Sequence, residues 1–340
     1  MVRCFQVAGL CFALDLPDNH PVWDQLHNYD PFVIASQPGS SSLLKTSDCV
    51  GPLPPQSGGP LPLSNRGWLR FSEGTAADAA PSFADVIGES LFQLKIIDRR
   101  PGAPGEVLMR SEEEKGEPVV GFYRCGEGYL AEFSPMPGRP VCGVLEMSGG
   151  FREGRLWTEG SPADQAFAVN NALMLLYAFA SAPFGALEMH ASVVTHGGRG
   201  FLFLGRSGTG KSTHSHLWLE HIPGTELLND DNPVLRVVDG AARVFGSPWS
   251  GKTPCYKAQD VPVGAIVRLQ QAPENRISRF GAVQAYASVM ASCSGFRPIR
   301  SIADAQHETL AAVVAGVPCY QLDCLPDADA ARLCQQTVDG

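Results

Sequence analysis

The stretch Phe201-Leu202-Phe203-Leu204-Gly205-Arg206-Ser207-Gly208-Thr209-Gly210-Lys211-Ser212 decides how the rest of the chain is interpreted. Its last eight residues fit the pattern G-x-x-x-x-G-K-[ST] in full. An apolar run leads into these residues, and a helical pattern over 211–221 follows them. Strand, glycine loop and helix in this order form the context in which the motif binds phosphate groups. The sequence therefore predicts a phosphate-binding loop (P-loop).

Each residue type in this loop has a chemical reason. Glycines let the backbone turn its N–H groups onto phosphate oxygens, and the helix N-terminus adds partial positive charge. Lys211 is expected to neutralise the β- and γ-phosphates of a nucleotide, and the Ser212 hydroxyl to ligate Mg²⁺. An accidental glycine turn is the alternative, since the chain holds 36 glycines. The expected nucleotide-binding set is Gly205, Arg206, Ser207, Gly208, Thr209, Gly210, Lys211, Ser212 and Thr213.

Two acids follow the next apolar run. Asn229-Asp230-Asp231-Asn232 comes directly after Leu227-Leu228. Asn and Asp also cluster in ordinary turns, so a polar turn is the alternative. With a P-loop just upstream we favour a catalytic pair, because a kinase site needs carboxylates to hold Mg²⁺ and to accept the proton of the attacking hydroxyl.

His190 lies in Glu188-Met189-His190-Ala191-Ser192-Val193-Val194, one predicted strand before the loop strand. A buried histidine with a satisfied hydrogen bond is one interpretation. The other places it on a neighbouring strand, where it pairs with Asp230 and tunes the basicity of that carboxylate. The spacing leaves both open.

The pattern of the chain changes near residue 160. Residues 1–160 are strand-rich, and loops rich in Gly, Pro and Ser separate the apolar runs. Ser161-Pro162-Ala163-Asp164 then predicts a helix start, and the apolar helix after it runs to about 182. Later strands alternate with helices, which predicts an α/β domain over 161–340 after a strand-rich N-terminal domain over 1–160. The N-terminal strands are expected at 4–7, 11–16, 68–71, 92–97, 119–123 and 129–133.

Composition narrows the class of protein. In 340 residues, 44% are hydrophobic and 18% charged, which is typical of a globular chain. A net charge of -9 argues against nucleic acid as a partner. No apolar run is expected to reach the ~20 residues of a membrane-spanning helix. Ten cysteines without a CxxC pair give no zinc signature; their scattered spacing favours free thiols in the cytosol, although the even count also allows disulfides.

Three of these elements, in this order, resemble the HPr kinase/phosphorylase family of the phosphoenolpyruvate carboxykinase superfamily. They are His190-Ala-Ser-Val-Val, the loop over 205–212 and Asn229-Asp230-Asp231. The family's serine-kinase-like relatives also carry segments similar to Gly246-Ser-Pro-Trp-Ser-Gly-Lys252 and Glu274-Asn-Arg-Ile277. The resemblance covers roughly residues 185–325. It implies a nucleotide-binding fold of the HPr kinase/PEP carboxykinase type, with ATP and Mg²⁺ as cofactors.

The resemblance also implies roles for residues. Asp230 would be the general base, His190 would orient it, and Asp231 would help to bind Mg²⁺ with Ser212, although the two aspartates could exchange roles. Lys252 and Arg276 would contact the γ-phosphate or the acceptor; each could equally be a solvated surface cation. The expected activity is transfer of the γ-phosphate of ATP to a serine-type hydroxyl of a protein, peptide or small molecule.

The chain departs from the family in two respects. No acid in 243–247 matches the glutamate that HPr kinases supply to the metal, and the loop used for phosphorolysis is not found. HPr is therefore in doubt as the substrate, and residues 1–160 are candidates for recognising the acceptor. A nucleotide sensor without catalysis and a carboxykinase-type lyase are the alternatives. A cytoplasmic location is expected, and a homo-oligomer stays open.

Overall fold

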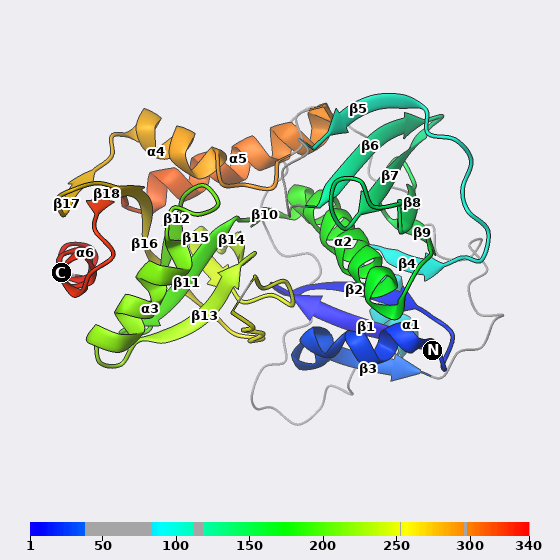
Figure 1. Ribbon diagram of the computed structural model, residues 1–340, viewed down its shortest axis with the longest axis horizontal. Coiled ribbons are helices and arrows are strands. Elements are labelled where there is room, and N and C mark those ends of the chain that lie inside the picture. The colour runs from blue at the N-terminus through cyan, green and yellow to red at the C-terminus, as the bar shows by residue number, and fades with distance from the viewer. Residues whose placement is uncertain (38–82, 112–117, 252, 296–297, 340) are drawn as a thin grey trace.

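The computed structural model describes residues 1–37, 83–111, 118–251, 253–295 and 298–339. The strand predicted at 68–71 and the candidate Lys252 lie outside these residues. The described chain is a mixed α/β structure built on two large sheets, each formed by a different half of the sequence (Figure 1).

The first sheet contains nine strands in the order β3-β1-β2-β4-β9-β8-β7-β6-β5. Short apolar runs form these strands, and Leu10–Asp15 is buried at five of its six positions because both of its faces are covered. Of the strands predicted for this half, all those in the described residues are present. Their bounds are β1 Val2–Val7, β2 Leu10–Asp15, β3 Val33–Gln37, β4 Gln93–Ile96, β5 Glu106–Arg110, β6 Val119–Cys125, β7 Gly128–Ser134, β8 Gly143–Met147 and β9 Glu153–Thr158.

Helix α2, Pro162–Ser181, packs on this sheet. It begins as the sequence predicts: the Ser161 hydroxyl accepts from the Asp164 backbone N–H, and the Asp164 carboxylate accepts from the Ser161 backbone in return. The segment Pro162–Phe184 is long and apolar enough to cross a membrane, which corrects the expectation that no run reaches that length. In this structure 61% of the apolar window is buried inside the protein, as in a core helix. Shorter helices in this half are η1 Pro21–Gln25, η2 His27–Phe32 and α1 Phe83–Gly88.

The second sheet has the order β10-β14-β15-β16-β12-β11-β13, and β18 and β17 extend it from β16. Only the β12–β16 and β16–β18 pairs are parallel. Its strands are β10 Ala186–Glu188, β11 Ala191–His196, β12 Arg199–Leu204, β13 Glu226–Asp231, β14 Val234–Val238, β15 Ala241–Phe245, β16 Asp260–Gln271, β17 Arg276–Arg279 and β18 Cys319–Cys324. The one strand predicted around His190 is instead two strands, because the chain leaves β14 after Glu188 and pairs with β12 from Ala191.

Helices cover both faces of the second sheet. Phe201 and Phe203 pack with Trp218 on one face, whereas Leu202 and Leu204 pack with Val289 on the other. This alternation follows from the two-residue period of a strand, and it explains why β12 is apolar throughout. The helices are η3 Ala182–Phe184, α3 Lys211–His221, α4 Ala282–Met290, α5 Arg300–Gly316 and α6 Ala328–Val338, and α3 matches the helix predicted over 211–221.

One buried hydrophobic cluster extends across both halves. Residues of the first sheet, α2, Trp249 and Ile302 belong to a single buried cluster. The Trp249 indole donates to the Tyr29 hydroxyl at 2.9 Å. Arg236 of β14 is buried and donates to the backbone oxygens of Ala8 and Phe184. The sequence boundary near 160 therefore separates the two sheets, but one buried cluster crosses it.

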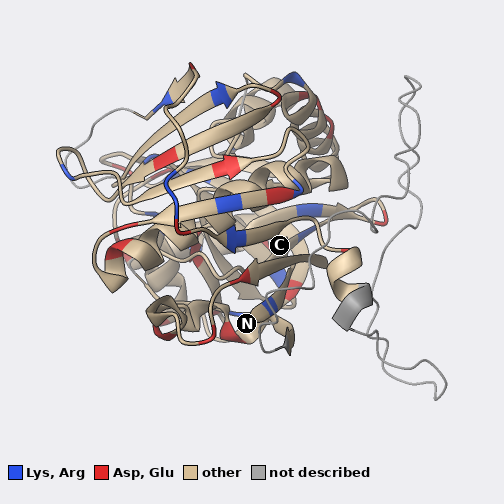
Figure 2. Cartoon of the chain, turned by 90° about the vertical axis from the view of Figure 1, so that its right-hand side faces the viewer, with Lys and Arg blue, Asp and Glu red and all other residues tan. Residues whose placement is uncertain are grey.

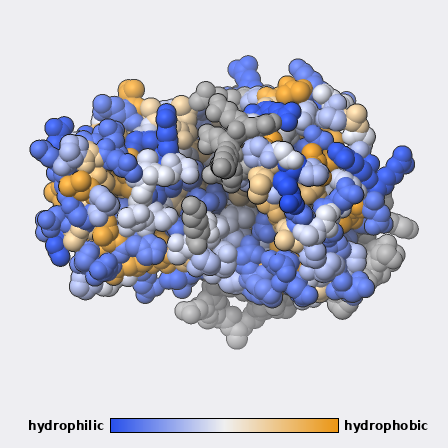
Figure 3. Space-filling model, in the orientation of Figure 1, coloured by the Kyte–Doolittle hydropathy of each residue, from blue (hydrophilic) through white to orange (hydrophobic). Residues whose placement is uncertain are grey.

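The surface mixes charge and polarity. Lys and Arg are interspersed with Asp and Glu on the side drawn in Figure 2, and the exposed apolar side chains in Figure 3 form small patches among hydrophilic ones. Within the described residues all nine cysteines are free thiols, as their spacing favours.

Candidate functional site

One edge of the second sheet brings the predicted site residues together. Ala191 of β11 is opposite both Leu204 of β12 and Asp231 of β13. His190 immediately precedes Ala191, and the glycine loop immediately follows Leu204. Strand pairing alone therefore places the histidine, the loop and the acid pair at the same end of three neighbouring strands.

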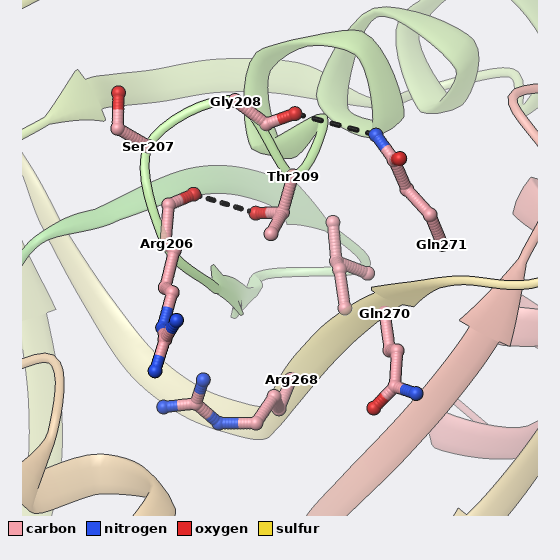
Figure 4. Close-up of a pocket in the computed structure, with 8 residues that line it drawn as sticks. Arg206, Ser207, Gly208, Thr209, Arg268, Gln270 and Gln271 are labelled. Atoms are coloured by element: carbon pink, nitrogen blue, oxygen red, sulfur yellow. Dashed lines mark hydrogen bonds between the residues drawn. The ribbon is translucent and has the colours of Figure 1, made fainter.

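The loop over 205–210 joins β12 to α3 and needs its glycines. Gly208 and Gly210 have φ of +79° and +101°, a region that L-residues with a side chain rarely adopt. A Cβ at Gly205 would lie 2.3 Å from Thr209 Oγ1. Thr209 in turn donates from its hydroxyl to the Arg206 carbonyl at 2.7 Å, which closes the turn (Figure 4).

Lys211 opens α3 and points back into the loop. It is only 9% exposed, and its Nζ lies 2.8 Å from His190 Nε2 and 3.1 Å from the Gly205 carbonyl oxygen. Since an ammonium group only donates, Nε2 is the acceptor and the proton of a neutral imidazole is on Nδ1. Burial lowers the pKa of Lys211, although the charges of Asp231 and Asp230 act in the opposite direction.

Asp230 is the inner member of the acid pair. It is 2% exposed, and its Oδ1 accepts from the Ser212 hydroxyl at 2.9 Å. No group in the described residues donates to its buried Oδ2. A buried carboxylate oxygen without a donor, beside the serine that follows the glycine loop, fits a divalent cation.

Asp231 is the outer member and is under backbone strain. Its φ is +143°. A backbone conformation of this kind costs a non-glycine residue about 1–3 kcal/mol, and residues that adopt one are concentrated at functional sites. Its side chain is 39% exposed, with Oδ1 3.4 Å from His190 Nε2 and Oδ2 accepting from the Asn232 amide at 3.0 Å. Burial raises the pKa of the Asp231 carboxyl, although His190 and Lys211 lower it.

The strained backbone is held by the segment after β15. The Gly251 N–H donates to the Asp230 carbonyl, and Ser250 pairs with Asp231 as an isolated bridge. A Cβ at Gly251 would lie 3.1 Å from both the Asp230 oxygen and the Asp231 Cβ. Gly251 therefore allows the closest approach of this segment to the acid pair.

A cavity of about 470 Å³ adjoins the loop. It is lined by residues 206–209 of the loop and 268–271 at the end of β16. Figure 4 shows the Arg206 and Arg268 side chains extending toward one another. Burial, and after it the charge of Arg206, lowers the pKa of Arg268. The Arg268 Nε donates to the Ser288 hydroxyl oxygen at 2.8 Å, which holds this side chain in place. Two neighbouring guanidinium groups favour an anion between them.

Sequence reasoning missed Arg268, Gln270 and Gln271 of this cavity. The Gln271 amide donates to the Gly208 carbonyl at 3.3 Å. Their position depends on the parallel pairing of β12 and β16, which sets Leu204 beside Arg268 and so brings the ends of both strands to one edge. Ligands in α/β sheets bind at that edge.

Arg276 lies away from this group. It starts β17, which is reached from β12 across β16 and β18. Three strand spacings correspond to about 14 Å, and the Arg276 side chain is exposed. A role for Arg276 at the loop thus remains only a prediction.

Glu188 is a buried acid that sequence reasoning did not single out. It is 3% exposed, and no group in the described residues donates to either carboxylate oxygen. Burial, and then the charge of Asp231, raises its pKa well above 4.5. It is the last residue of β10 and lies two residues before His190 in the sequence.

This acid should make stability depend on pH. Below about pH 4.5 the carboxyl is protonated in both the folded and the unfolded chain, so its ionisation does not affect stability. Above that pH the unfolded chain releases the proton and the folded chain keeps it, so stability falls by up to about 1.4 kcal/mol per pH unit until the folded pKa is reached. We expect Glu188→Gln to be more stable than wild type at pH 8 and nearly equal at pH 4.5.

Urea unfolding at several pH values measures this difference. Glu308→Gln, at an exposed acid of α5, is the matched control. A Glu188→Gln variant whose stability difference from wild type is constant between pH 4.5 and 8 would show that Glu188 is ionised in the folded protein.

Comparisons with known proteins do not identify a family for this chain. No protein-family profile matches the sequence, and no curated protein matches it. Among solved structures, the chain is similar to the Hpr(Ser) kinase/phosphatase from Coxiella burnetii, with 13% identity over 45% of this chain and 99% of that one and a TM-score of 0.27. A likeness this low does not establish a shared fold, so the function has to be inferred from the site itself.

Proposed function

We propose that this chain is a phosphotransferase that passes the γ-phosphate of ATP to a hydroxyl group. The observation that carries the proposal is the hydrogen bond between Ser212 and Asp230, which joins the P-loop to an acid pair under backbone strain. A P-loop alone would bind phosphate. The neighbouring acids supply what transfer additionally requires, a metal site and a base.

Mg²⁺ fits the Ser212–Asp230 side of this site. No cluster of three His, Cys, Asp or Glu side chains suited to a metal exists among the described residues. Mg²⁺ does not need one, since it commonly uses one or two carboxylates together with phosphates and water. Ser212 and Asp230 would hold the ion, which would neutralise charge on the phosphates when bound.

Lys211 and the loop would hold the nucleotide. The backbone N–H groups at the start of α3 would attract phosphate oxygens, because a helix N-terminus favours negative charge. Lys211 would provide the positive charge for the β- and γ-phosphates. To reach them, its ammonium must exchange the His190 contact for a phosphate oxygen. His190 Nε2 would then have to take up a proton to donate to Asp231 Oδ1, 3.4 Å away. Arg206 and Arg268 line the adjoining cavity and favour the nucleotide's negative charge.

The geometry favours Asp231 as the base and Asp230 as the metal ligand, the reverse of the roles first assigned from the sequence. A base must reach the acceptor, and Asp231 is 39% exposed whereas Asp230 is 2% exposed. The raised pKa of Asp231 also improves it as a proton acceptor. The attacking hydroxyl would give its proton to Asp231 as its oxygen bonds to the γ-phosphorus and ADP leaves.

Incubation with γ-labelled ATP and Mg²⁺ tests the proposal, with the protein alone, with free serine and with a cell extract. Nucleotide binding is measured separately with a fluorescent ATP analogue. Transfer of label to an acceptor supports a phosphotransferase. Binding without turnover would identify a nucleotide sensor instead, and CO₂ release from oxaloacetate would identify a carboxykinase-type lyase.

A further inference from the structure

A second cavity, of about 310 Å³, lies where the two halves of the chain meet. Its walls come from η1 and η2 and from α2 on one side, and from the segments after β13 and β15 on the other. Residues far apart in the sequence, such as Asn28 and Pro248, are joined directly across it by a hydrogen bond of 2.9 Å. Neither sheet forms this cavity alone.

The lining is rich in uncharged hydrogen-bonding groups. Five carboxamides face this cavity, and none of its described lining residues is charged; the carboxamides are Gln25, Asn28, Asn170, Asn171 and Asn232. Trp249 and Tyr256 add aromatic surface. A carboxamide both donates and accepts, so this set matches ligand hydroxyls, which also do both. With no cation in the described lining, an anionic ligand would lose hydration without compensation.

The carboxamides are held in place before any ligand binds. The Asn28 amide donates to Asn170 Oδ1 at 3.0 Å, and the amides of Asn170 and Asn171 donate to carbonyls one turn earlier in α2. Two consecutive asparagines are unfavourable in the interior of an apolar helix. Helix stability therefore does not account for them: the Asn28 hydrogen bond accounts for Asn170, and a polar ligand would account for Asn171.

This cavity is connected to the acid pair. Asn232 lines it and donates to Asp231 Oδ2 at 3.0 Å. Ser250 also lines it and donates to the Asp230 carbonyl at 3.2 Å. A ligand in the cavity thus lies one residue away from the carboxylate assigned as the base.

We propose that this second cavity binds the phosphoryl acceptor, and that the acceptor is an uncharged polyhydroxy compound of the size of a monosaccharide. The inference rests on the proposed function. The volume is at the lower end of the roughly 300–1,000 Å³ of small-molecule sites, which suits one sugar or polyol. One acceptor hydroxyl loses its proton to Asp231, its oxygen bonds to the γ-phosphorus, and the bond from that phosphorus to the β–γ bridging oxygen breaks to release ADP.

The full chain is tested with γ-labelled ATP, Mg²⁺ and one probe at a time. The neutral probes are D-glucose, D-ribose, myo-inositol and glycerol, and the comparators are L-serine and a short seryl peptide. We expect label on at least one neutral probe and on neither comparator. Label on serine or the peptide alone, or on no probe while MgATP still binds, would overturn the acceptor assignment and leave nucleotide binding intact.

Asn171→Ala tests the site itself. Removing this carboxamide should raise KM for the labelled probe about tenfold or more, with a much smaller change in kcat, because the lost hydrogen bonds are to the acceptor. Asn19→Ala, at an exposed asparagine outside the cavity, is the matched control. An unchanged KM in Asn171→Ala would overturn the proposal. Failure of the wild-type chain to bind the fluorescent ATP analogue would instead overturn the proposed function.

Discussion

Replacing Asp231 by asparagine is expected to lower the rate of phosphoryl transfer by about 10²–10⁴-fold, the contribution of a positioned base. Asparagine keeps the shape of the side chain and can still accept from Asn232, so the strained backbone at this position is retained. Affinity for MgATP should change far less than the rate. The measurement is label transfer from γ-labelled ATP, together with the separate binding assay.

Two comparisons make this prediction specific. Asp329→Asn changes an exposed acid of α6 and should leave the transfer rate unaltered. Asp230→Asn removes the carboxylate bonded to Ser212 and should chiefly weaken the dependence of nucleotide binding on Mg²⁺. If Asp230→Asn instead abolishes transfer with Mg²⁺ dependence intact, and Asp231→Asn stays active, the roles first assigned from the sequence are the correct ones.

Replacing Lys211 by methionine is expected to weaken ATP binding by about 10–150-fold, the loss of one charge-assisted contact worth about 1.5–3 kcal/mol. The fold should not suffer. Lys211 is buried, and burial lowers its pKa, so the folded protein bears a cost to keep this charge away from water. We therefore expect Lys211→Met to be at least as stable as wild type in urea unfolding.

This combination separates function from structure. Lys257→Met removes a lysine on the surface, paired with Glu226, and serves as the matched control for affinity. A Lys211→Met variant that binds ATP as tightly as wild type would show that the lysine only braces the Gly205 and Arg206 carbonyls. A large loss of stability would point to the same structural role.

Several parts of the fold could be predicted because the sequence patterns that indicate them are local. The loop over 205–212 follows from a motif, α3 from the pattern after it, and the start of α2 from Ser161 and Asp164. The position of the acid pair beside the loop could also be anticipated, since both follow apolar strands. These features depend on short stretches of sequence, where residue type and spacing determine the conformation.

The remaining features depend on contacts between distant residues. The break between β10 and β11 results from a change of pairing partner, which no local pattern marks. Arg268 and Asn171 were missed because each reaches its cavity only through the packing of other elements. The strain at Asp231 is likewise set by Ser250 and Gly251, twenty residues further along the chain.

The buried cluster that α2 shares between both sheets limits how this protein can be divided or recombined. A chain cut near residue 160 would expose the apolar faces of α2 and of Trp249 to water, so neither piece should be soluble by itself. Exchange of the first 160 residues for those of another protein would also have to preserve the contacts around Tyr29 and Arg236. A new acceptor preference should therefore arise more readily from single substitutions where the two sheets meet than from the exchange of a whole half of the chain.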